Sequence, residues 1–134
     1  MLERDCIQSR GFQNTEKDGQ IVGFQFTIRS LYYRGLWLSQ LRPATVWVNT
    51  EEFGPETITW TIKRQTYTHE EMAKCGDIHW GLLDLATINV EKPGGLGPGL
   101  YEIRLSYTYS ASYLPPRIDT LLGNQTHVRK LVMV

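Results

Sequence analysis

The side chains that most often hold metals or transfer protons are few in this chain. Its histidines are His69, His79 and His127, and only His79 has a cysteine, Cys75, four residues away. A structural zinc site needs four converging ligands and a catalytic site three, so one such pair is a weak signal. The histidines and cysteines therefore predict no metal ligand and no catalytic group in this chain.

Two other patterns could carry chemistry. Glu51 and Glu52 are adjacent, so in a strand they point to opposite faces and cannot form the carboxylate pair of a glycoside hydrolase. The stretch "KPGGLGPG", residues 92–99, is rich in glycine. A phosphate-binding loop needs its lysine after the second glycine and a helix behind it, whereas here the lysine comes first and a strand pattern follows. This stretch predicts a turn between strands, and its glycines allow a close approach by a partner or ligand.

Aromatic residues are concentrated in "RSLYYRGLWLSQL", residues 29–41, which has three aromatic rings and two arginines but no acid to pair with them. Such a segment is either packed against the core or is a surface for binding. Trp60 lies on an inward-facing pattern and is predicted to be core. Trp47 alternates with two valines, so either the tryptophan or the valines face outward. Exposed tryptophans would favour sugar stacking or a protein interface.

Alternation of apolar and polar residues is the dominant pattern along the chain. In "LYEIRLSYTYS", residues 100–110, the tyrosines, Ile103 and Leu105 point one way while the charged and hydroxyl side chains point the other. "VGFQFTIR" and "ITWTIK" repeat the pattern, and "HVRKLVMV" can close a sheet. Thr68 and Glu71 form a capping box, which predicts a helix of about two turns that ends before Gly76.

These elements predict one domain over residues 1–134 and an all-β fold. We expect an antiparallel β-sandwich or jelly roll of seven or eight strands, with one short helix near Thr68–Lys74. A chain of this length buries roughly two-thirds of its unfolded surface and needs no disulfide or metal to fold.

Charge and composition exclude several partners. The 14 basic and 14 acidic residues cancel, which argues against nucleic acids and anionic membranes. No apolar run approaches the ~20 residues of a membrane helix. The start, "MLERDCIQSR", lacks an apolar signal core, so we expect a cytoplasmic protein whose Cys6 and Cys75 are free thiols.

Together the segments "YYRGLWLSQL", "QTYTHEEM" and "VEKPGGLGPGLYEIRLSYTYSASYLP" are similar to the small (β) subunit of bacterial C-glycoside deglycosidases. The resemblance runs from about Gly19 to about Pro116. Its most distinctive marks are "YYRG" followed by "LS", and the "KPGGLGPG" turn.

The resemblance implies a lyase of two kinds of subunit. The large subunit would be a TIM barrel with a divalent metal, expected to be manganese, and the small one a β-sandwich docked beside it. The substrate would be a C-glycoside whose sugar carries a 3-keto group and whose aglycone is flavonoid-like or another phenolic ring system. A base would remove the proton at C2, the metal would stabilise the enolate, and elimination would break the C1–aglycone bond.

Metal and base would then belong to the large subunit, and this chain would have no cofactor of its own. Tyr32, Tyr33 and Arg34 are predicted to anchor the subunit interface or line the substrate mouth, with Gly35 allowing a sharp turn beside them. Lys92, Pro93 and Gly94 are predicted to form a second, smaller partner-facing loop.

Other functions remain open from the sequence alone. A stand-alone carbohydrate-binding β-sandwich would bind a glycan without a partner. A structural oligomerisation domain would affect assembly but never substrate preference. An autonomous enzyme is the least favoured function, because its acid–base and metal groups are missing from the sequence patterns.

Overall fold

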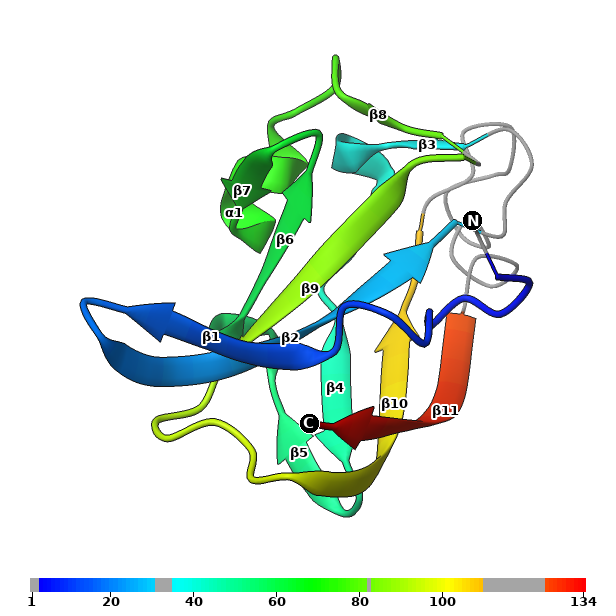
Figure 1. Ribbon diagram of the computed structural model, residues 1–134. Helices are drawn as coiled ribbons and strands as arrows, with labels where there is room; N and C mark the ends of the chain where they lie inside the picture. The colour runs from blue at the N-terminus through cyan, green and yellow to red at the C-terminus, as the bar shows by residue number, and fades with distance from the viewer. Residues whose placement is uncertain (1–2, 31–34, 82, 110–124) are drawn as a thin grey trace.

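The structure, a computed structural model, describes residues 3–30, 35–81, 83–109 and 125–134. The strands pair antiparallel in two sheets and a two-stranded ribbon (Figure 1). The five-stranded sheet has the order β1 (Gln13–Lys17), β2 (Gln20–Arg29), β9 (Leu85–Glu91), β6 (Ile58–Ile62) and β7 (Gln65–Tyr67). The four-stranded sheet has the order β11 (Gln125–Met133), β10 (Gly99–Tyr107), β4 (Thr45–Val48) and β5 (Glu51–Phe53). The ribbon joins β3 (Leu36–Trp37) to β8 (His79–Trp80).

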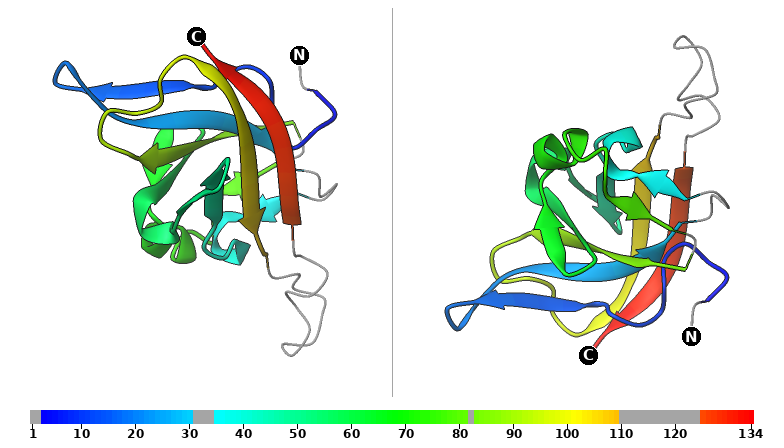
Figure 2. Two further views of the ribbon diagram at one scale, coloured as in Figure 1. Left: turned by 90° about the horizontal axis from the view of Figure 1, so that it is seen from below. Right: turned by 90° about the horizontal axis from the view of Figure 1, so that it is seen from above.

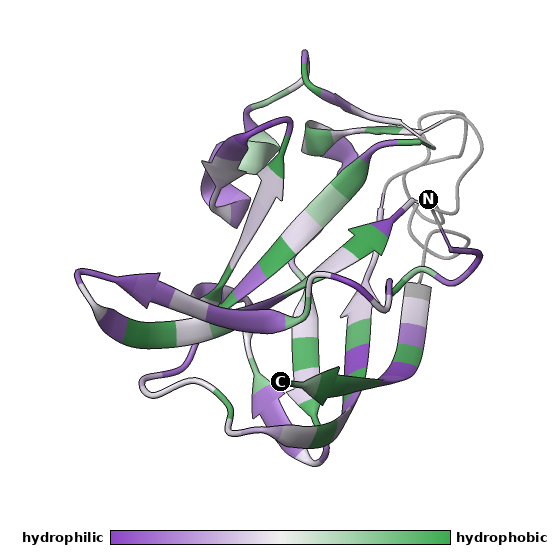
Figure 3. Ribbon diagram, in the orientation of Figure 1, coloured by the Kyte–Doolittle hydropathy of each residue, from purple (hydrophilic) through white to green (hydrophobic). Residues whose placement is uncertain are grey.

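The inward faces of the two sheets form the core, as the alternation predicts. Ile103 and Leu105 of β10 are fully buried while Arg104 between them is exposed. Figure 3 shows the same banding of apolar and polar residues along the long strands. Rings join the layers, because Trp60 of β6 lies 5.7 Å from Tyr107 of β10 between ring centroids. The predicted all-β antiparallel sandwich is confirmed, and Trp60 is core.

The described residues form eleven strands, more than the seven or eight predicted. The additional ones, such as β3 and β8, are only two or three residues long. A segment that short contains too few residues to show an alternating pattern, so pairing partners elsewhere in the chain decide whether it is a strand.

Two tight hairpin turns have different sequence signals. Asp18 (φ 54°) and Gly19 (φ 78°) join β1 to β2, as the Asp-Gly pair predicts. Lys63 (φ 51°) and Arg64 (φ 72°) join β6 to β7 although neither is a turn residue. Positive φ costs a non-glycine residue about 1 kcal/mol or more, and the β6–β7 pairing has to offset that cost.

The predicted helix is present but shorter than expected. In α1 (His69–Ala73) the Thr68 hydroxyl accepts from the Glu71 amide at 3.2 Å, and the Glu71 carboxylate accepts from the Thr68 amide at 3.0 Å. The helix ends at Ala73, before Gly76. No helix in the described part of the chain is long and apolar enough to cross a membrane. Two 3-10 turns, η1 (Leu38–Gln40) and η2 (Pro55–Thr57), complete the elements.

Candidate functional site: the ribbon end

One end of the sandwich combines exposed apolar side chains with an ordered aromatic scaffold. The ribbon β3–β8, the loop after it and the start of β9 lie at this end (Figures 1 and 2). Trp37 of β3 is 45% exposed, Leu83 of the loop 80% and Leu85 of β9 46%. We call this region the ribbon end. Apolar exposure of this kind is typical of surfaces that a partner or ligand covers.

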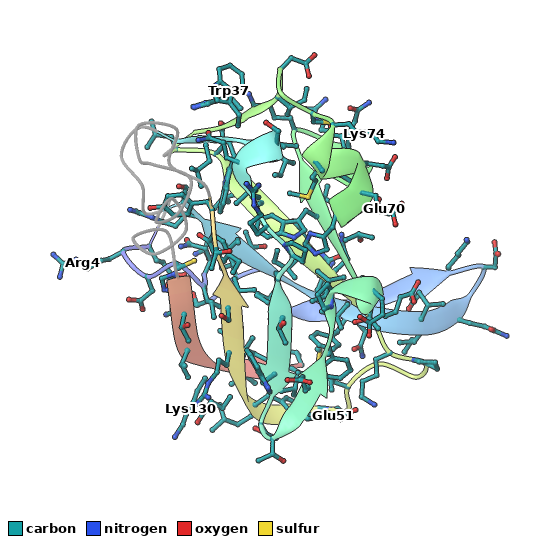
Figure 4. All side chains as sticks on the ribbon, turned by 180° about the vertical axis from the view of Figure 1, so that it is seen from behind. Arg4, Trp37, Glu51, Glu70, Lys74 and Lys130 are labelled. Carbon is teal, nitrogen blue, oxygen red and sulfur yellow. The ribbon has the colours of Figure 1, made fainter. Side chains whose placement is uncertain are left out.

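The tryptophan at the ribbon end is held by a histidine from the facing strand. Trp37 and His79 are cross-strand partners, and their rings meet edge to face with centroids 5.0 Å apart. The imidazole lies against Gly35, where an added Cβ would be 2.7 Å from His79 Nε2 and 2.8 Å from the Trp80 carbonyl oxygen. Gly35 has φ +70°, so both its backbone and its neighbours favour glycine. The Trp37 indole, labelled in Figure 4, is therefore preorganised at the surface.

Buried rings support the ribbon from below. Trp80 of β8 is fully buried and contacts Trp60 edge to face at 5.5 Å. Its indole N–H donates to the Asp84 carbonyl at 3.0 Å, and the Asp84 carboxylate accepts from the Gly81 amide at 2.9 Å. These two bonds fix the loop that carries Leu83 to the same scaffold.

Two of the three histidines line this scaffold, and burial lowers the pKa of both. His69 lies 6.5 Å from Trp60, and its Nε2 accepts from the Ala44 amide at 3.4 Å. His127 lies 6.3 Å from Tyr107. Desolvation disfavours the charged imidazolium, so the pKa of His69 and of His127 falls below the ordinary value of 6.5. Both are therefore mainly neutral at pH 7.

The cysteines and acids complete no metal-binding group with these histidines in the part of the chain that the structure describes. Both cysteines are free thiols, as predicted, and burial raises the pKa of Cys6 to about 12. Such a thiol stays protonated and unreactive in the folded state. Across residues 3–30, 35–81, 83–109 and 125–134, no group of three or more His, Cys, Asp or Glu could hold a metal ion.

The predicted interface residues fall in two separate places. Tyr32, Tyr33 and Arg34 lie outside the described residues, while Gly35 lies in the ribbon end. Lys92, Pro93 and Gly94 lie beyond the other end of β9, far along the strand from the ribbon (Figure 1). The structure thus separates the two predicted partner-facing segments.

Sequence patterns missed His79, Leu83 and Leu85. A His-Trp dipeptide gives no signal that its histidine supports a tryptophan 42 positions earlier. Trp47 is half-buried, whereas its neighbours Val46 and Val48 are buried. Of the two orientations that the sequence allows, the structure therefore has the tryptophan facing outward and the valines inward.

Fold and surface define the chain as a small antiparallel β-sandwich with an exposed aromatic end. Residues 2–113 match the model of the family "C-glycoside deglycosidase beta subunit". A protein of that name from Eubacterium cellulosolvens is 40% identical to this chain over 119 residues, which cover 88% of this chain and 81% of the relative. The chain therefore belongs to the C-glycoside deglycosidase beta subunit family, as the sequence resemblance implies.

Proposed function

We propose that this chain is the accessory β subunit of a heteromeric C-glycoside deglycosidase and that it docks on the α subunit through the ribbon end. The family match over residues 2–113 carries this proposal. A subunit called beta implies an alpha partner, and Trp37, Leu83 and Leu85 offer that partner exposed apolar area.

The chemistry we propose takes place on the α subunit, a TIM barrel that binds a divalent metal, expected to be manganese. The substrate is a 3-keto C-glycoside. A base would remove the C2 proton, which the neighbouring ketone acidifies, and the metal would supply electrostatic stabilisation of the negative charge on the ketone oxygen. Electrons from the enolate then form the C1–C2 double bond, the C1–aglycone bond breaks, and the aglycone carbon takes up a proton.

The ribbon end is well built for anchoring. Tryptophan, tyrosine and arginine dominate interface hot spots, and truncating one typically costs ~2 kcal/mol or more of association energy. The Trp37 ring is already fixed by His79, so binding immobilises little that was free. Tyr32, Tyr33 and Arg34 come directly before Gly35 in the sequence and are proposed to take part in the same anchor. Lys92, Pro93 and Gly94 are proposed as a weaker second contact.

Co-expression with the α-subunit gene tests the proposal. We expect the two chains to co-elute in size exclusion, and aglycone to be released from a 3-keto C-glycoside only when both chains and manganese are present. Tyr33→Ala and Arg34→Ala should each weaken assembly while the thermal unfolding of the isolated chain stays unchanged.

The proposal would be contradicted if this chain does not bind the α subunit and is retained by itself on a glycan column. That result would favour a stand-alone carbohydrate-binding module. Unchanged assembly of both variants, with a wild-type complex present, would contradict only the anchor assignment.

A further inference from the structure

The outer face of the five-stranded sheet is hollowed on the side away from the core. The hollow has a volume of about 700 Å³ and lies between the β1–β2 hairpin and strands β6, β7 and β9. That volume is within the range of small-molecule sites, roughly 300–1,000 Å³. Five of its twelve lining residues are threonines, so we call it the threonine hollow.

Strand register places three uncharged polar side chains in one row across the floor. Asn89 of β9 is the direct partner of Thr59 on β6 and of Gln25 on β2. Neighbouring strands are about 4.8 Å apart, so the row presents a hydroxyl and two amides over roughly 10 Å. All three side chains are only half-buried and line the hollow.

A second row is linked to the first by hydrogen bonds. The Asn89 side-chain amide donates to the Thr61 hydroxyl at 2.9 Å, and the Thr61 and Thr66 hydroxyls are 2.8 Å apart. In the Thr61–Thr66 bond either hydroxyl can be the donor. Within the described residues the Asn89 side-chain carbonyl oxygen makes no hydrogen bond, so it is left as an acceptor. Within the described residues, the side chains of Thr59 and Gln25 make no hydrogen bond.

Charge in the hollow is confined to three lining residues, Glu16, Lys17 and Glu91. One cation beside two acids does not suit a phosphate or another anion. The floor is instead neutral and offers donors and acceptors side by side, and a sugar hydroxyl both donates and accepts. Val22, 39% exposed, adds an apolar contact for the C–H groups of a sugar ring.

We propose that the threonine hollow binds the ring of a neutral carbohydrate through Thr59, Asn89 and Gln25. This site is separate from the ribbon end and does not depend on the α subunit. Its floor is open to water and holds no aromatic ring, so the affinity is weak, with a Kd on the order of 1 mM.

Chemical-shift mapping on the isotope-labelled full chain tests the site. Glucose and cellobiose, each raised to about 50 mM, should shift the amide signals of Thr59, Asn89 and Gln25 in a saturable way. Thr59→Val and Gln25→Leu keep size and strand preference but remove the polar groups, and each should weaken binding by about tenfold. Thr45→Val is the matched control, because Thr45 faces outward, half-buried, on the other sheet. It should leave the affinity unchanged.

Several results would overturn the inference. These are no saturable shift, equal affinity in Thr59→Val and wild type, or shifts that disappear in Trp37→Ala and so report the ribbon end. Loss of sugar binding when the α subunit is added, together with failure of Thr59→Glu to assemble, would show that this face is a subunit interface. If the α and β subunits do not assemble at all, the proposed function is contradicted, but the inference about the threonine hollow is not affected.

Discussion

The sequence predicts a partner contact both at the ribbon end, from its aromatic segment, and in the loop at residues 92–98, from its glycines. The two regions are nevertheless built differently. At the ribbon end, Gly35 makes room for a side chain, His79, which in turn holds an exposed tryptophan. In the loop, the glycines serve the chain's own backbone. The amides of Lys92 and Gly94 donate to the carbonyls of Val22 and Ile21 at 3.0 and 3.1 Å.

Side-chain bonds complete the attachment of that loop. The Asn14 amide accepts from the Leu96 N–H and donates to the Leu96 carbonyl, both at 2.9 Å, and the Leu96 side chain is buried. The difference teaches that glycine in a loop does not by itself indicate a binding surface. At the ribbon end the glycine makes room for the residue that holds an exposed ring. In residues 92–98 the glycines let the loop bind to the β1–β2 hairpin.

Gly35→Ala should have the largest effect. The new Cβ meets the His79 ring and the Trp80 carbonyl, and the left-handed backbone disfavours alanine. We expect the free energy of unfolding to fall by about 3 kcal/mol, measured by urea denaturation.

Gly94→Ala is the control for that substitution. Gly94 has a similar φ, +82°, but no atom lies within 4 Å of the position of its Cβ. Only the backbone cost of about 1 kcal/mol should appear. If the free energy of unfolding falls equally in the two variants, the His79 ring can move aside at no cost, and Gly35 is not needed to make room for it.

Trp37→Ala compares the two regions as partner surfaces. We expect the dissociation constant of the α–β complex to rise at least tenfold, because a preorganised anchor is lost, whereas Lys92→Ala should raise it by less than about threefold. A titration of one purified subunit over the other, immobilised on a sensor surface, measures both dissociation constants. A larger effect from Lys92→Ala would reverse the proposed order of the two contacts.

Asn14→Ala removes both side-chain bonds that hold the loop. Leu96 then leaves a backbone donor and acceptor without their partner, which should cost about 2 kcal/mol of unfolding free energy. Asn14→Asp keeps only the acceptor and should lose about half as much. If Asn14→Ala unfolds like the wild type, water replaces the amide and the loop is held by its backbone alone.

Much of the fold could be predicted from the sequence because its long strands show strict alternation. The inward set of β10, the core position of Trp60 and the Asp18–Gly19 turn all follow from local patterns. The Lys63–Arg64 turn could not be predicted, since strand pairing imposes positive φ on residues that do not favour it. The candidate site was harder still. Gly35, Trp37 and His79 meet only because β3 pairs with β8, and neither two-residue strand has a pattern of its own.

Lowering the pH should destabilise the ribbon end more than the loop at residues 92–98, and this is the smallest of the expected effects. The pKa values of His69 and His127 are lowered by burial, so below the ordinary pKa of 6.5 the unfolded chain binds protons that the folded chain does not. Stability from these groups is therefore fully present above pH 6.5 and is lost as pH falls through that value towards the folded pKa. Both histidines contact the rings beneath the ribbon, whereas residues 92–98 contain no histidine.

Hydrogen exchange at about pH 7.5 and about pH 5.5, corrected for the intrinsic rate, locates the loss. The protection of the Leu36 and Trp80 amides should fall on acidification, while that of the Lys92 and Gly94 amides should fall less. His69→Gln keeps a neutral acceptor for the Ala44 amide and should flatten the pH dependence of the ribbon end. If protection falls equally in both regions, protonation acts through global unfolding and the aromatic scaffold is not a separate acid-sensitive unit.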